Sequence, residues 1–173
     1  MNFVKTFLIS LLIYLGLNTV FALIAVFTVP GFPTTDIMLI ITMIFAPIFT
    51  SPTAAWTTSG ILPLLATTDI LIDLMTFLGL ILPPLIAVIV ASFLGDSNKT
   101  VFGAWLTTAL LTAVVYAILL GIGQLSSSNL AIDWFGKVAT YGELGTILVI
   151  FTAGIANGFF YGCVVYIITK AGL

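Results

Sequence analysis

Residues 7–29 read FLISLLIYLGLNTVFALIAVFTV, a stretch without a single charged side chain. A helix of roughly 20 apolar residues crosses the ~30 Å hydrocarbon core of a bilayer, so this stretch is long enough to span it. It follows Lys5 and ends at Pro30-Gly31, which stops a helix. Secretory signals have a shorter apolar core followed by a small-residue cleavage site. We therefore interpret residues 7–29 as a retained first transmembrane helix.

The same pattern recurs along the whole chain. Uncharged stretches occupy residues 6–35, 37–68, 74–95, 100–132 and 144–169. Only 6% of the 173 residues are charged and 61% are hydrophobic, whereas soluble domains carry about 25% charged residues. The sequence therefore predicts an all-α fold, a polytopic transmembrane helix bundle of five to six membrane segments. No polar block is long enough to fold separately, so residues 1–173 are interpreted as one integral membrane domain.

Residues 37–68 leave the number of segments open. They contain Pro47, Pro52 and Pro63 and a hydroxyl-rich centre over residues 50–59. This region could form one long, broken helix, or a Pro-broken hairpin or re-entrant region. Two complete crossings would need about 40 residues, so a hairpin would be short or would span incompletely. Irregular backbone at membrane depth is tolerated only where it is buried in protein or lines a wet cavity.

The lysines favour the arrangement with six segments. If residues 37–68 cross the membrane twice, three of the four lysines share one side, namely Lys5, Lys99 and Lys170. If they cross once, Lys99 and Lys170 fall on the opposite side from Lys5. Because cytoplasmic loops retain positive charge, we expect both termini in the cytoplasm. The expected location is the plasma membrane of a prokaryote.

The connection over residues 125–144 is the longest polar segment. Trp134 and Tyr141 stand there among charged residues, a composition typical of a segment lying at the membrane interface. We expect the acidic residues of turns and loops to be solvated, namely Asp36, Asp96, Asp133 and Glu143. Thr34, Thr35 and Asp36 are plausible N-caps for the helix that follows them.

Glycines recur every four residues in the last segment, at Gly154, Gly158 and Gly162. This spacing places them on one stripe of a helix, where missing side chains let another backbone approach closely. We predict a helix-packing interface there. The neighbour could be another helix of the same bundle, a second copy or a different membrane subunit, or the backbone of the stripe could approach a ligand. The expected partners are thus the lipid bilayer and other membrane subunits, or self-association through the last helix. The charges are too sparse for nucleic-acid binding.

Five polar side chains are candidates for lining a path for a solute or an ion: Asn18, Thr53, Thr57, Asp73 and Asn157. An amide in hydrocarbon needs hydrogen-bond partners, so the two asparagines should face the bundle interior or water. The threonines stand beside prolines that free backbone carbonyls. Asp73 is expected one turn inside its helix, where a proton or cation would offset the cost of its charge. Each also has a structural alternative, as a helix-to-helix hydrogen bond or an interfacial carboxylate.

The composition lacks the side chains that metal sites and catalysis usually need. The chain has no histidine and a single cysteine, Cys163, so the usual ligands of zinc, haem and iron–sulfur sites are missing. We expect no metal and no cofactor. No activated nucleophile, catalytic acid–base pair or phosphate-binding glycine loop is found. We therefore expect no catalytic residues and no enzymatic activity.

The size, the few charges and the broken helices resemble the substrate-binding membrane components of energy-coupling-factor vitamin transporters. The resemblance covers the general layout. Those components carry an Ala-xxx-Ala pattern in the first helix, whereas Ala22 and Ala25 are three apart here, so no family residue is transferred. The sequence favours a small non-enzymatic multi-pass membrane protein, a subunit involved in solute or ion translocation. The alternative is a structural or assembly subunit of a larger membrane complex with no ligand of its own.

Overall fold

The computed structural model describes residues 2–45, 61–66 and 70–170, and every element in these ranges is a helix. The helices are α1 (Phe3–Thr28), α2 (Ile37–Phe45), α4 (Ile61–Ala66), α5 (Ile70–Leu94), α6 (Asn98–Gly123) and α7 (Ser128–Lys170). Four of them, α1, α5, α6 and α7, are long and apolar enough to cross a membrane. The all-helical fold is thereby confirmed for the described residues, and four of their helices have the length and hydropathy that crossing a membrane requires.

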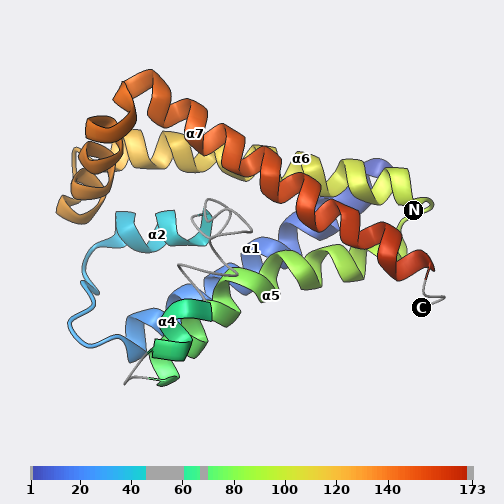
Figure 1. Cartoon of the computed structure of the whole chain (residues 1–173), viewed down its shortest axis with the longest axis horizontal. Coiled ribbons are helices and arrows are strands. Elements are labelled where there is room, and N and C mark those ends of the chain that lie inside the picture. Colours follow the sequence, from blue (N-terminus) through green and yellow to red (C-terminus); the bar gives the residue numbers. More distant parts are fainter. Residues whose placement is uncertain (1, 46–60, 67–69, 171–173) are drawn as a thin grey trace.

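The long helices run back and forth between two ends of an elongated bundle (Figure 1). We call the end that holds both chain termini and the turn at 95–97 the terminal end. The opposite end, where α1 and α6 finish and the short α2 and α4 lie, is the loop end. The chain thus leaves α1 and enters α5 at the same end. The lysines of the N-terminus and of the α5–α6 turn share the terminal end, as the six-segment arrangement requires, while the side of the membrane remains a prediction.

The Pro-broken region is described only at its margins. Helix α2 has 9 residues and α4 has 6, which corresponds to roughly 14 Å and 9 Å of rise. Neither is long enough to span a bilayer by itself. The hydroxyl-rich centre lies outside the described residues, so the count of five to six segments and the break remain predictions. Helix α5, in contrast, continues from Ile70 to Leu94 with Pro83 and Pro84 inside it.

Helix α7 is broken at Gly142, which has φ 72° and ψ 168°. This conformation is open to glycine and strained for other residues. Residues 128–141, here called the α7 arm, turn away from the long remainder of the helix (Figure 1). The segment expected to lie at the interface is therefore mostly helical. Ile132 and Phe135 on the arm are exposed, as an interfacial helix requires.

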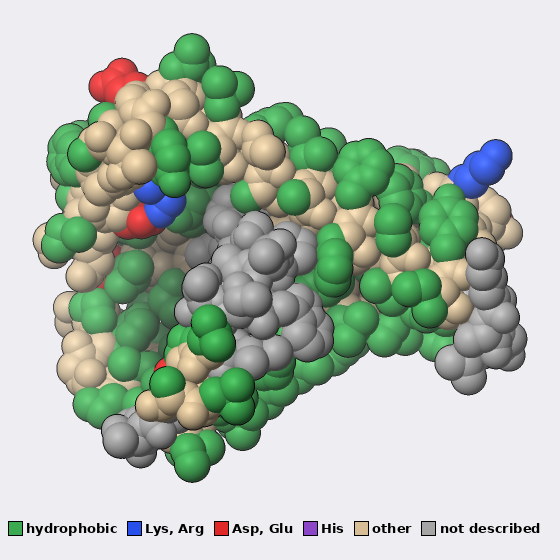
Figure 2. Space-filling model, in the orientation of Figure 1, with side chains coloured by type: hydrophobic (Ala, Val, Ile, Leu, Met, Phe, Trp, Pro, Cys, Tyr) green, Lys and Arg blue, Asp and Glu red, His purple; other side chains and the backbone are tan. Residues whose placement is uncertain are grey.

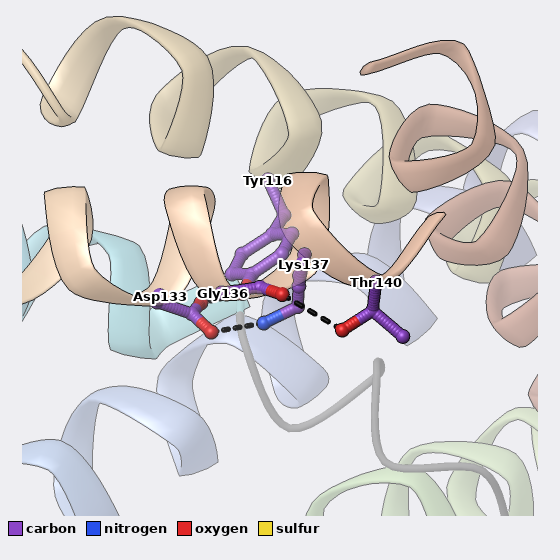
Figure 3. Close-up of polar contacts among 5 residues, drawn as sticks. All are labelled: Tyr116, Asp133, Gly136, Lys137 and Thr140. Carbon is purple, nitrogen blue, oxygen red and sulfur yellow. Dashed lines mark hydrogen bonds and ion pairs between the residues drawn. The ribbon is translucent and has the colours of Figure 1, made fainter. Parts of the chain in front are cut away.

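The arm is held to α6 by a polar contact (Figure 3). The hydroxyl of Tyr116 donates to Asp133 Oδ2 at 3.0 Å, and Lys137 pairs with the same carboxylate. Asp133 is partly exposed, with 40% of its side chain accessible, and it also anchors the arm. The reason is that a buried tyrosine hydroxyl needs an acceptor, and the first turns of the arm bring Asp133 to Tyr116.

Hydrophobic side chains are spread over the described surface between the two ends of the bundle (Figure 2). On the face shown, charged side chains lie only towards the two ends. Large apolar side chains project outwards from several helices, among them Leu12 at 69% exposure and Phe27 at 84%. Such a surface would be an aggregation liability in water. In a bilayer it is the surface that the hydrocarbon contacts.

The glycine stripe of α7 lies against α6 of the same chain. A Cβ added to Gly154 would come within 2.7 Å of the Cβ of Ala113, and one added to Gly158 within 2.6 Å of Leu106. At Gly162 it would meet Phe102 at 2.8 Å. The stripe therefore lets the backbones of α6 and α7 approach closely. A partner helix could not use the same face without displacing α6, so self-association through α7 would have to use another face.

We expect Gly158→Leu to destabilise the bundle by about 1–3 kcal/mol, because overpacking at a close helix contact forces α6 and α7 apart. The matched control is Gly121→Leu on α6, where an added Cβ meets nothing within 4 Å. Thermal unfolding in detergent measures both variants against the wild type. Equal melting temperatures for the two variants would contradict the close packing at the stripe.

Candidate functional site

One face of α1 is polar and buried along most of the membrane. Thr6, Ser10, Tyr14 and Asn18 recur at intervals of four residues, and each is at most 1% exposed. Residues four apart lie on the same face of a helix. Burying polar groups costs free energy unless they are hydrogen-bonded, yet the Ser10 hydroxyl oxygen has no partner among the described residues. We call this face the polar stripe of α1.

At Asn18, its loop-end member, this stripe meets a cavity of about 150 Å³ between α1, α2 and α5. Its wall runs along α1 from Asn18 to Val29 and along α5 from Leu80 back to Ile72. Eleven residues of helix correspond to roughly 16 Å. The cavity therefore extends from the middle of the bundle to the loop end.

Asn18 marks the inner part of the cavity and ties α1 to α2. Its Nδ2 donates to the backbone carbonyl oxygen of Ile44 at 2.7 Å. Because a carbonyl can only accept, this contact fixes which way the amide points. The other amide atom, Oδ1, is buried and has no hydrogen-bond partner among the described residues. Asn18 is therefore both a helix tether and an unsatisfied acceptor.

The terminal-end half of the same face is closed by packing. Tyr14 meets the indole of Trp105 edge-on, with ring centroids 5.6 Å apart, and Trp105 meets Tyr161 at 6.3 Å. Ala87 and Val88 of α5 are fully buried in the same cluster. One half of the α1–α5 boundary is thus open and the other half is filled by side chains.

The predicted site residues do not all meet. Asn18 lines the cavity, but Asn157 is buried on α7, where its backbone carbonyl accepts from Trp105 Nε1 at 3.4 Å. Asp73 lies in the first turn of α5 and is half-buried, beside residues that line the cavity but not in the lining itself. Thr53 and Thr57 fall outside the described residues. The role of Asp73 with cations remains a prediction, and the described residues contain no cluster of metal-binding side chains.

Sequence reasoning singled out Asn18 but missed the rest of the stripe. The signal was present, since the polar residues at 6, 10, 14 and 18 keep a spacing of four. The hydrophobicity of the surrounding residues did not distinguish the packed face of α1 from its lipid-facing face, because both faces of a membrane helix are apolar.

A second polar cluster joins the α1–α2 loop to the start of α7. Asp36 Oδ1 accepts from the backbone N–H of Leu39 at 3.0 Å, which confirms its predicted capping role at α2. Its Oδ2 accepts from Ser127 Oγ at 2.6 Å and from Asn129 Nδ2 at 3.1 Å. Ser127 in turn accepts from the N–H of Leu130 and caps α7. Asp36 is partly exposed, as expected, and it also joins the two segments, because this loop and the α6–α7 turn meet at the loop end.

These contacts change the acidity of Asp36. The hydrogen bond from Ser127, and those from Leu39 and Asn129, hold its pKa below the ordinary value of 3.8, against a smaller opposing effect of burial. All of these donors belong to the chain itself. We therefore interpret the cluster as a structural latch, and the cavity beside Asn18 as the candidate functional site.

Comparison with known proteins finds no matching family model, no matching curated protein and no matching solved structure. None of these comparisons supports the resemblance in layout to energy-coupling-factor components. The cavity and the polar stripe are the features that bear on function.

We expect the Asp36 latch to stabilise the fold in a pH-dependent way. A carboxyl whose pKa is lowered by folding contributes stability fully above its unfolded value, here near 3.8. That contribution is lost as the pH falls below 3.8 through the lowered pKa of the folded state. Asp36→Asn should therefore lower stability at pH 7 by about 1 kcal/mol, and its deficit should shrink towards pH 3.

Thermal unfolding of Asp36→Asn and wild type between pH 7 and pH 3 measures this convergence. Glu143→Gln is the control, since Glu143 is an exposed carboxylate on the far side of the Gly142 break. A constant difference between Asp36→Asn and wild type over the whole range would contradict the latch.

Proposed function

We propose that this chain is a non-enzymatic membrane protein that moves a small solute along the polar stripe of α1. The cavity beside Asn18 would be its binding site, facing the loop end. The observation that carries the proposal is the division of one helix boundary into an open half and a packed half. A site near the middle of the membrane with one closed side is the geometry that alternating access requires.

The polar stripe supports a path beyond the cavity. Thr6, Ser10 and Tyr14 continue the line of Asn18 towards the terminal end. At Ser10 a purely structural core would gain more from an apolar side chain, because its buried hydroxyl oxygen has no partner among the described residues. Ser10 lies where a solute would pass if the packed half opened. Other subunits of an assembly would supply any energy source.

Cysteine accessibility tests this proposal without knowledge of the solute. In a Cys163→Ser background, Ala25→Cys reports on the cavity and Ser10→Cys on the packed half. An impermeant thiol reagent reacts only where water reaches the cysteine, because the thiolate is the reactive form. We expect Ala25→Cys to react from the loop end, and Ser10→Cys to react from the terminal end at least 10-fold more slowly.

Val88→Cys is the matched control, because Val88 is fully buried in the same packed half but lies off the stripe. It should remain unreactive. If Ser10→Cys is as inert as Val88→Cys from both sides, the path along α1 does not open. Translocation is then excluded, and an assembly subunit without a transported solute becomes the better interpretation.

A further inference from the structure

Three hydrogen-bond acceptors at the inner part of the cavity lack their usual donor among the residues that the structure describes. Asn18 Oδ1 is one of them, in a side chain that is only 1% exposed. Two more follow from the prolines of α5. In a helix the carbonyl of residue i accepts from the N–H of residue i+4, and Pro83 and Pro84 have no N–H. The carbonyls deprived of this donor belong to Gly79 and Leu80, and both of these residues line the cavity.

The other polar groups of the lining already donate. The hydroxyl of Thr28 donates to the carbonyl of Ile24 at 2.8 Å, and that of Thr76 to the carbonyl of Ile72 at 2.9 Å. The amide nitrogen of Asn18 donates to α2. The donors of the lining are thus already used, whereas its acceptors are available to a molecule in the cavity.

The rest of the described lining is apolar and uncharged, and it includes Phe21, Met43 and Met75. A cation would have to give up its hydration without gaining a carboxylate, which is costly in such surroundings. A neutral molecule has no such cost, and its apolar surface would be buried against these side chains. An apolar cavity of about 150 Å³ is large enough for benzene.

We propose that the cavity binds a neutral, largely apolar molecule about the size of one aromatic ring that carries a hydroxyl or N–H donor. This inference rests on the proposed function only in that it names the class of solute that would be moved. Binding to the cavity can occur without translocation. The donor would satisfy Asn18 Oδ1 or the carbonyls of Gly79 and Leu80. The ring would fill the apolar part, which a single water molecule would leave empty.

Phenol and toluene are suitable probes, because they have the same size and differ by a hydroxyl in place of a methyl group. Equilibrium dialysis against the full chain in lipid nanodiscs, with empty nanodiscs subtracted, removes the contribution of partitioning into lipid. We expect saturable binding of phenol at one site per chain, at least 10-fold tighter than that of toluene. Equal affinities, or no saturable binding of either probe, would overturn the proposal.

Three variants locate the binding. Asn18→Leu keeps the approximate shape of the side chain and should remove most of the preference for phenol. Ala25→Phe places a ring in the cavity, since Ala25 lines it, and should abolish binding of both probes. Gly16→Leu on the same helix points into open space and should bind like the wild type. Phenol binding that survives Ala25→Phe would place the site elsewhere and refute the assignment.

The two proposals fail separately. If phenol binds as expected while Ser10→Cys stays inert, the cavity is a ligand site in a protein that does not translocate. If Ser10→Cys reacts while phenol and toluene bind alike, the path exists but its solute belongs to another class. Should Asn18→Leu fail to fold, the comparison of phenol with toluene on the wild type still decides the proposal.

Discussion

The hydrocarbon interior of a bilayer offers no hydrogen bonds, and every polar group of this chain within it must therefore find a partner in the protein. Helices satisfy the backbone, and hydroxyl side chains follow the same rule. Thr19, Thr108 and Thr152 each donate to a carbonyl of their own helix, at 2.7–3.0 Å. Against this background the oxygens of Ser10 and Asn18 are exceptions, because they have no partner among the described residues, and both lie on the polar stripe of α1. The constraint that shapes the fold thus also identifies the site.

The sequence was sufficient for the features that depend on the solvent and insufficient for those that depend on contacts between distant residues. Long uncharged stretches predict spanning helices because only lipid accommodates them. The capping role of Asp36 was also readable, since it involves a residue three positions away. Its bond to Ser127 joins residues 91 positions apart and required the arrangement of α1, α2 and α6. The same holds for the placement of the glycine stripe against α6 rather than a partner.

The cavity was the least predictable feature. In a soluble protein the buried face of a helix differs in hydrophobicity from the exposed face, but lipid-facing residues are as apolar as core residues. The sequence therefore could not tell that Asn18 and Asn157 belong to different surroundings. Pro83 and Pro84 have no N–H to donate to the carbonyls of Gly79 and Leu80. The sequence could not show that these two residues line a cavity, because that depends on which face of α5 meets α1. Polar spacing on α1 was the one usable signal.

Helix α2 connects the latch with the cavity. At its start Asp36 binds Ser127 and Asn129 next to the α7 arm, and near its end the carbonyl of Ile44 binds Asn18. Met43 on the same helix forms part of the cavity wall. Helices α1, α5, α6 and α7 are joined through the buried cluster around Trp105. Helix α2 is held by these polar contacts and by Met38, Leu39 and Phe45, which pack against a second apolar cluster of α6 and α7. A solute that hydrogen-bonds to Asn18 acts on the side chain that also holds α2. In the proposed mechanism, binding at Asn18 is thereby coupled to the position of α2, while passage beyond the cavity requires the packed half around Tyr14 and Trp105 to open.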